Sequence, residues 1–366
     1  MIYENVFPSP ASDNSIKALR ECLLKSIFKN YPPPLSSNLP KHAQHFLTDD
    51  NLTRYLVARD MDINKAAKVA INSWAWMEKR DMFTANLDDA DSEKEILNEG
   101  LTGKIHVPFC DCHGRPVVLF DDNAQNTKDV GKQMRFMAWN FDLAIKAMAV
   151  TDVLTRKDDV ESLTRASLLP PQSLGPGPKV SKWVLFIRLD AFSLLNSPAM
   201  STTKETLSTM TNVYAERLGL VVAYDAPGYF NTVYNVLKPL IDARTRTKIL
   251  VVPKGRWKEG NEVDDKLKGL LGENWRELTK VDKSYAQTGR PFLSPGFDRA
   301  SNFDKAYEIE RRWREEVEPD ILKDIRRILD EGEEGGGGAV VDGGDQKPTP
   351  QPYNPLSGPV KPNPNP

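Results

Sequence analysis

The spacing of apolar residues along the sequence changes near Gly103, and this change limits the architecture that the chain can adopt. Between Ser15 and Arg80, apolar residues recur every three to four positions, which predicts amphipathic helices. After Gly103, short runs rich in β-branched residues and bounded by turn residues alternate with helical stretches; these runs are HVPF, DCHGRPVVLF, KWVLFIRLD, GLVVAYDAP and TKILVVP. The sequence therefore predicts an α/β fold, with a helical N-terminal lobe followed by a lobe built on a mixed sheet.

Segments rich in glycine and proline set the remaining boundaries. Residues 331–366 hold eight glycines and eight prolines in a polar background, which predicts a disordered tail. PPQSLGPGP at 170–178 is predicted to be a surface loop. We expect a helical lobe at 1–82, an α/β lobe at 100–275, a C-terminal helical extension at 276–330 that is interrupted at Pro319, and the tail at 331–366.

The amino-acid composition limits the classes of binding partner and the cellular compartment that we expect for this protein. Lysine and arginine number 49 against 51 acidic residues, so the net charge of -2 gives no general attraction for nucleic acid. Three cysteines are too few for a disulfide framework, which favours a reducing compartment. No apolar run reaches the ~20 residues of a membrane span, and the first residues lack a signal-peptide pattern. We expect a soluble, cytoplasmic protein that is a monomer.

Catalytic and metal-binding patterns have little support in the sequence. The hydrolase elbow, the phosphate-binding loop and the dinucleotide-binding motif are absent, so the chain is not expected to be an enzyme or to hold a cofactor. His42 and His45 stand three residues apart, and Cys110, Cys112 and His113 cluster, which is compatible with zinc. The tip of a hairpin explains the second cluster better, so no metal is expected.

Four segments in fixed order resemble the CRAL-TRIO family of lipid-binding and lipid-exchange proteins. They are LTRYLVARDMDINKAAKVAINSWAWMEKR (52–80), DCHGRPVVLF (111–120), KWVLFIRLDAFS (182–193) and YAERLGLVVAYDAPGYFNTVYNVLKPLIDARTRTKILVV (214–252). The last is the most specific. The resemblance implies a sheet and helices that enclose a hydrophobic lipid pocket, with a mobile gate near 228–241.

The gate segment has a pattern that suits this role. Apolar residues cover well over half of a helix between Gly228 and Ile241, and Pro239 is expected to loosen the helix end. An ordinary buried helix is the alternative. The residues expected at the gate and cavity are Val118, Leu185, Ile187, Tyr229, Phe230, Val233, Tyr234, Leu237 and Leu240.

The resemblance also implies a site for a lipid headgroup. Matching the family's motifs position by position assigns it to Arg59, Glu216, Arg217, Thr245 and Lys248, whose cations, hydroxyl and carboxylate suit a phosphodiester and inositol hydroxyls. Two cations of the family's first motif are missing, because Val57 and Asp60 stand in their places. Each residue also has a purely structural alternative, such as a solvated Glu216–Arg217 pair or a Thr245 cap.

Phosphatidylinositol is therefore the expected ligand, taken up or presented at a membrane surface that the protein visits transiently. Phosphatidylcholine is less favoured, because Val118, Leu185 and Ile187 carry no hydroxyl groups. One alternative is a neutral ligand such as a sterol, tocopherol, isoprenoid or retinoid. Another is an adaptor with a vestigial pocket, whose PTPQP segment at 348–352 docks on an SH3-type partner.

Overall fold

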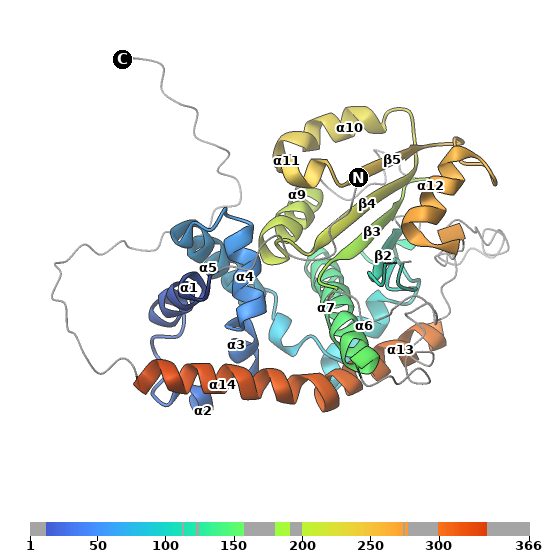
Figure 1. Ribbon diagram of the computed structural model, residues 1–366. Coiled ribbons are helices and arrows are strands. Elements are labelled where there is room, and N and C mark those ends of the chain that lie inside the picture. The colour runs from blue at the N-terminus through green and yellow to red at the C-terminus, as the bar shows by residue number, and fades with distance from the viewer. Residues whose placement is uncertain are drawn as a thin grey trace, which may run out of the picture.

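A computed structural model describes residues 12–111, 113–121, 124–156, 180–190, 200–273, 275–276 and 299–334. The predicted loop at 170–178 and residues 335–366 lie outside these ranges. The chain begins with a helical lobe, as predicted (Figure 1). Its elements are α1 (Asp13–Ser26), α2 (Leu35–Asn38), α3 (Lys41–Phe46), α4 (Asp49–Val57), α5 (Ile63–Lys79) and the 3₁₀ turn η1 (Met82–Thr84).

The second lobe is a mixed five-stranded sheet with helices on both faces, which confirms the predicted α/β class (Figure 1). The strands are β1 (Ile105–His106), β2 (Val117–Asp121), β3 (Trp183–Arg188), β4 (Leu218–Ala226) and β5 (Ile249–Pro253), in the order β1-β2-β3-β4-β5. Only β1 is antiparallel to its neighbour, and Phe186 pairs with Leu119 on one side and Val222 on the other. The helices are α6 (Ala90–Glu99), α7 (Val130–Arg156), α9 (Met200–Ser208), the π-helical turn η3 (Thr209–Val213), α10 (Phe230–Leu237), the 3₁₀ turn η4 (Lys238–Leu240), α11 (Ala243–Arg246) and α12 (Glu262–Leu271).

Side chains of successive strand residues point to opposite faces, so the near-continuous apolar runs of β2–β4 build two cores. On one face Val184, Phe186 and Val222 pack with Leu267 and Leu271 of α12. On the other face Trp183 and Leu185 pack against α7, where Phe141 stacks on Trp183 at a centroid distance of 4.9 Å. This second face also carries the candidate site.

The C-terminal helices return to the helical lobe. They are α13 (Arg299–Arg312), the π-helical turn η7 (Trp313–Val317) and α14 (Glu318–Glu334), and α14 lies along α2 and α3 (Figure 1). The chain is not broken at Pro319, contrary to the prediction: the π turn lies before it, and Pro319 is the second residue of α14. A proline is tolerated at this position because the first N–H groups of a helix have no intrahelical acceptor. Because α14 ends at Glu334, residues 331–334 are helical rather than part of the predicted tail.

Polar contacts join the two lobes. Arg54 of α4 donates a buried hydrogen bond to the backbone oxygen of Val213 at 2.6 Å, and Arg217 forms an ion pair with Asp50 at 2.9 Å. Ala215 belongs to the apolar core of the helical lobe. The segment between η3 and β4 is therefore held by the helical lobe. Among the described helices, none has both the length and the apolar character required to cross a bilayer.

Candidate lipid-binding cavity

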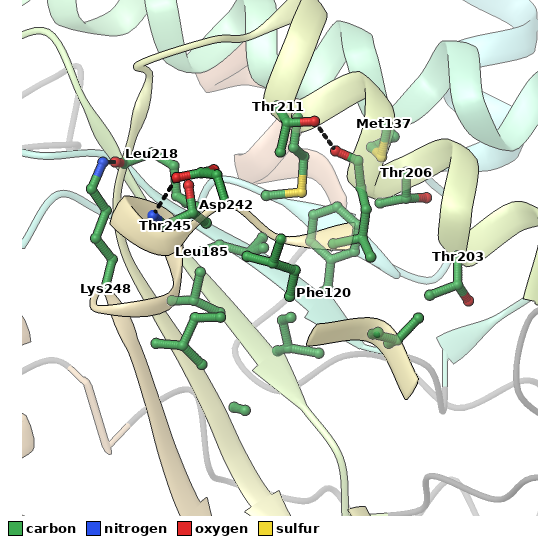
Figure 2. A pocket seen from close by; sticks show the side chains of 18 of the residues that line it. Phe120, Met137, Leu185, Thr203, Thr206, Thr211, Leu218, Asp242, Thr245 and Lys248 are labelled. Carbon is green, nitrogen blue, oxygen red and sulfur yellow. Dashed lines mark hydrogen bonds between the residues drawn. The ribbon is translucent and has the colours of Figure 1, made fainter. Parts of the chain in front are cut away.

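A cavity of about 910 Å³ lies between the α7 face of the sheet, α9 and the segment α10–α11. This volume is near the upper end of the roughly 300–1,000 Å³ typical of ligand sites. Apolar side chains from β2, β3, α7, η3 and the gate make up most of its wall, among them Phe120, Leu185, Ile187, Met134, Met137, Met210, Phe230, Val233, Tyr234 and Leu237. In Figure 2, Leu185 and Phe120 lie between polar groups on two sides of this cavity.

The gate segment α10 is amphipathic, with an apolar side toward the cavity and mainly polar residues exposed on the other side. Phe230, Val233, Tyr234 and Leu237 recur at helical spacing and line the cavity, as expected. On the other side Val236 is 58% exposed, and Tyr229, which precedes the helix, is 41% exposed and does not line the cavity. No residue of α10 is fully buried, so this segment is not an ordinary core helix.

Pro239 has the effect expected from the sequence. The α-helix ends at Leu237, and Lys238–Leu240 continue as a 3₁₀ turn with proline in its first positions. The side chain of Leu240 lies outside the described part of the structure. The helix type therefore changes at the end of the gate, where the 3₁₀ turn has poorer hydrogen-bond geometry than the α-helix before it.

The strand residues named from the sequence divide between the cavity and the core. Leu185 and Ile187 alternate along β3 and line the cavity. Val118 is fully buried in the core under α7 and does not reach the cavity. The next outward position on β2, Phe120, lines the cavity in its place.

Four of the five expected headgroup residues meet at one mouth of the cavity. Arg59, Glu216, Thr245 and Lys248 all line it. Arg59 donates to Asn212 Oδ1 at 2.8 Å, and Lys248 Nζ donates to the backbone oxygen of Leu218 at 2.9 Å (Figure 2). These partners orient both cations at the mouth, where they are only partly buried.

Arg217 is the exception, because it does not line this cavity. Its guanidinium donates to Asp50 Oδ2 at 2.9 Å and to the backbone oxygen of Ser181 at 3.2 Å. The side chain therefore ties α4 and the start of β3 to the start of β4. The neighbouring Glu216 has a φ of 60°, and this left-handed backbone is where the two adjacent side chains diverge to different surroundings.

Sequence reasoning missed several polar residues of the cavity. On the α9 side, Thr202, Thr203, Thr206 and Thr211 supply hydroxyl groups. Figure 2 shows Thr203 and Thr206 on the opposite side of the cavity from Lys248. The strand positions Leu185 and Ile187 are apolar, as expected from the sequence, and the hydroxyl groups of the cavity come from α9 and η3 instead. Repeated threonines in MSTTKETLSTMT were the available signal.

Three further charged residues at the mouth were not assigned to the site: Asp60, Asp242 and Arg244. Asp242 caps α11 by accepting a hydrogen bond from the Thr245 N–H at 2.8 Å (Figure 2). Burial would raise the pKa of Asp242, but the hydrogen bonds from Thr245 and the charge of Lys248 outweigh it and lower the pKa. The carboxylate is therefore ionised at neutral pH.

Lys104 adds a buried cation to the cavity wall, beside β1. It pairs with the buried carboxylate of Glu99 and donates to Thr127 Oγ1 at 2.8 Å. Desolvation lowers the pKa of Lys104, while the hydrogen bond and charge of Glu99 oppose that shift. The pairing keeps this end of the wall polar although its side chains are almost inaccessible to water.

The segment D-x-x-G-R-P has a structural role here. Asp111 N–H donates to the Arg115 oxygen at 2.8 Å to close a hairpin, and the two buried side chains form an ion pair at 2.6 Å. Gly114 has a φ of 75°, which suits the turn. Across the described ranges, no three His, Cys, Asp or Glu side chains gather so that they could hold a metal ion, and Cys112 lies outside those ranges.

Comparison with known proteins assigns this part of the chain to a family. The family model that matches is described as the CRAL/TRIO domain. Residues 101–267 match this CRAL/TRIO domain. The match covers β1–β5, α7, α9 and the gate, and therefore nearly the whole wall of the cavity; Arg59 and Asp60 at the mouth come from the helical lobe.

Three individual proteins illustrate the similarity. A CRAL-TRIO domain-containing protein of Schizosaccharomyces pombe is 26% identical over 282 residues, which cover 73% of this chain and 24% of that protein. A phosphatidylinositol/phosphatidylcholine transfer protein of Arabidopsis thaliana is 24% identical over 251 residues, covering 67% of this chain and 58% of that protein. The crystal structure of Sfh5 aligns with a TM-score of 0.44 at 14% identity, over 66% of this chain and 81% of that one. The chain thus spans about a quarter of the first relative and somewhat over half of the second.

Proposed function

We propose that this protein binds phosphatidylinositol in the CRAL/TRIO cavity and exchanges or presents it at cytoplasmic membrane surfaces. The observation that carries the proposal is an apolar cavity of about 910 Å³ under a gate without fully buried residues, with Arg59, Glu216, Thr245 and Lys248 at its mouth. A cavity of this size is not filled by the protein's own side chains, which disfavours a vestigial pocket.

The energetics explain what such a cavity must do. Two acyl tails of roughly thirty methylenes gain on the order of 25 kcal/mol by leaving water, at ~0.8 kcal/mol each. A bilayer offers nearly the same gain, so movement between bilayer and cavity is close to balanced. The protein's task is to keep water from the tails during passage, and the gate α10–η4 is the element that would open at a membrane and close in solution.

Lipids that co-purify with the full chain test the ligand. Mass spectrometry of wild type is expected to find phosphatidylinositol, and an Arg59→Ala/Lys248→Ala variant is expected to lose it. The matched control is Arg256→Ala/Lys258→Ala, which removes the same charge from an exposed loop outside the cavity. Full retention of phosphatidylinositol by the first variant refutes the headgroup assignment.

A carrier of a neutral lipid is the second candidate. It is favoured by the apolar wall and by the mouth itself, where Asp60, Glu216 and Asp242 offset the charges of Arg59, Arg244 and Lys248. Recovery of only a sterol or isoprenoid from wild type would select this function. The adaptor alternative predicts that deletion of residues 335–366, just beyond the end of α14, abolishes partner recruitment and leaves lipid loading intact.

A further inference from the structure

Arg244 is a cation at the cavity mouth with unused hydrogen-bonding capacity. It belongs to the short helix α11, its side chain is 50% exposed, and it lines the cavity. Its Nη1 donates to Glu216 Oε1 at 3.0 Å, and its Nη2 lies 3.8 Å from Asp60 Oδ1. No other acceptor within the described residues takes a hydrogen bond from this guanidinium, which has five N–H groups.

The two partners of Arg244 hold it unequally. The contact with Asp60 is long and the Asp60 side chain is 93% exposed, so this pair contributes under about 1 kcal/mol. Glu216 is a stronger partner, because its side chain is only 9% exposed and the bond is short. An anion that enters the mouth can therefore replace Asp60 at little cost while the Glu216 bond persists.

Glu216 itself has a free acceptor. Its Oε2 is buried and accepts no hydrogen bond within the described part of the chain. One carboxylate oxygen thus positions Arg244, and the other is available to a hydroxyl donor. The mouth brings together a cation suited to phosphate and an acceptor suited to a hydroxyl group.

Arg244 lies beside the segment around Arg59, which has fewer cations than the family's motif. The motif that contains Arg59 resembles that of the family except that two of its cations are replaced, by Val57 and Asp60. Arg244, from the other side of the mouth, lies beside Asp60 and restores one positive charge there. A planar guanidinium also binds phosphate through two parallel N–H bonds, which an ammonium cannot do.

We propose that Arg244 is a specificity-determining residue, which exchanges its contact with Asp60 for the phosphate of the bound lipid. The cavity then selects lipids that carry a phosphate over neutral lipids with the same tails. This inference rests on the proposed function in that it needs a lipid in this cavity, but it does not need inositol. The carboxylates of Asp60, Glu216 and Asp242 face the same mouth, so the selection depends on the geometry of the guanidinium and not on a large net positive charge.

Equilibrium loading from vesicles tests this proposal with three probes of identical acyl chains: phosphatidate, phosphatidylinositol and diacylglycerol. Arg244→Gln is expected to lower loading of both phosphate lipids about tenfold, which is ~1.4 kcal/mol, and to leave diacylglycerol unchanged. Arg244→Lys should recover only part of the loss. Arg246→Gln on the same helix is the control, because Arg246 bonds the Ile241 oxygen and does not line the cavity.

Asp60→Asn gives an independent variant. Because this carboxylate competes with phosphate for Arg244, its removal should keep phosphatidate loading constant or raise it, and a fall contradicts the exchange of partners. Equal losses of all three probes in Arg244→Gln, or no loss, overturn the proposal. Wild type that loads diacylglycerol but not phosphatidate overturns it as well. Arg244-dependent loading of phosphatidate without phosphatidylinositol supports the inference and refutes phosphatidylinositol as the ligand.

Discussion

The gate offers a direct test of whether the cavity holds hydrocarbon. Leu237 and Val236 are adjacent on α10, yet Leu237 lines the cavity and Val236 is exposed on the outside. Leu237→Asp places a carboxylate against the bound tail, whereas Val236→Asp places the same group in water. Because α10 contains no fully buried residue, neither change should unfold the protein.

The expected loss in Leu237→Asp follows from the apolar contact that is removed. Burial of a leucine side chain is worth about 1.5–3 kcal/mol, and part of this is contact with the lipid when the cavity is loaded. A loss of about 2 kcal/mol lowers occupancy roughly 30-fold, since each 1.4 kcal/mol is a factor of ten. Desolvation of the new carboxylate adds to this loss. Phe230→Asp, about two turns earlier at the start of α10, should behave in the same way.

The assay is equilibrium loading of a labelled lipid from vesicles, measured as bound lipid per protein, with a thermal melt to check folding. Loading is preferable to a transfer rate, because Val236→Asp could slow membrane contact without changing the cavity. We expect Val236→Asp to load like wild type. If Leu237→Asp and Val236→Asp load equally well, α10 does not cover the bound lipid and the gate assignment is wrong.

Three predictions concern residues outside the gate. Arg217→Met should lower the free energy of unfolding by about 1–2 kcal/mol in urea denaturation, because it breaks the half-exposed pair with Asp50, yet leave the choice of lipid unchanged. Lys104→Met should cost about 3–5 kcal/mol by stranding the buried Glu99 carboxylate, and a Glu99→Gln partner change should recover part of it. Burial raises the pKa of Asp142 to about 6, so the folded state holds this proton more tightly than the unfolded chain. The free energy of unfolding should therefore fall as the pH rises from about 4 to about 6, by at most about 3 kcal/mol. Asp142→Asn should flatten that pH dependence.

The alternation of short apolar runs with helical stretches predicted the architecture well. Such runs bury both of their sides, so they favour a sheet that helices cover on both faces. Four of the five runs correspond to the strands β2–β5, whereas in HVPF only His106 belongs to β1. Helix boundaries were less predictable: residues 35–57 divide into three helices, and the helix that was expected to break at Pro319 continues through it after a π turn. These details depend on tertiary contacts, such as those of α14 with α2 and α3, that local patterns do not encode.

The site was predictable only where a motif carried position as well as chemistry. The resemblance to the family's motif assigned Thr245 and Lys248 to the headgroup site, and both line the cavity, as do Phe230 and Leu237 of the gate pattern. Arg217 was misplaced because adjacency to Glu216 in sequence does not imply a shared direction, and here the left-handed backbone at Glu216 separates them. Arg244 could not be recognised from the sequence, because its proposed role depends on its contact with Asp60, which lies in the other lobe.

The balance of forces implies that lipid choice is decided at the mouth. The tails gain nearly as much from a bilayer as from the cavity, so their ~25 kcal/mol cancels from the exchange equilibrium. What remains is the difference between headgroup contacts in the protein and in the membrane surface, where a single charge-assisted hydrogen bond of about 1.5–3 kcal/mol is a large part of the total. Substitutions along the wall should therefore change how much lipid of every kind is held. Substitutions of Arg59, Arg244 or Lys248 should change which lipid is held at constant total occupancy.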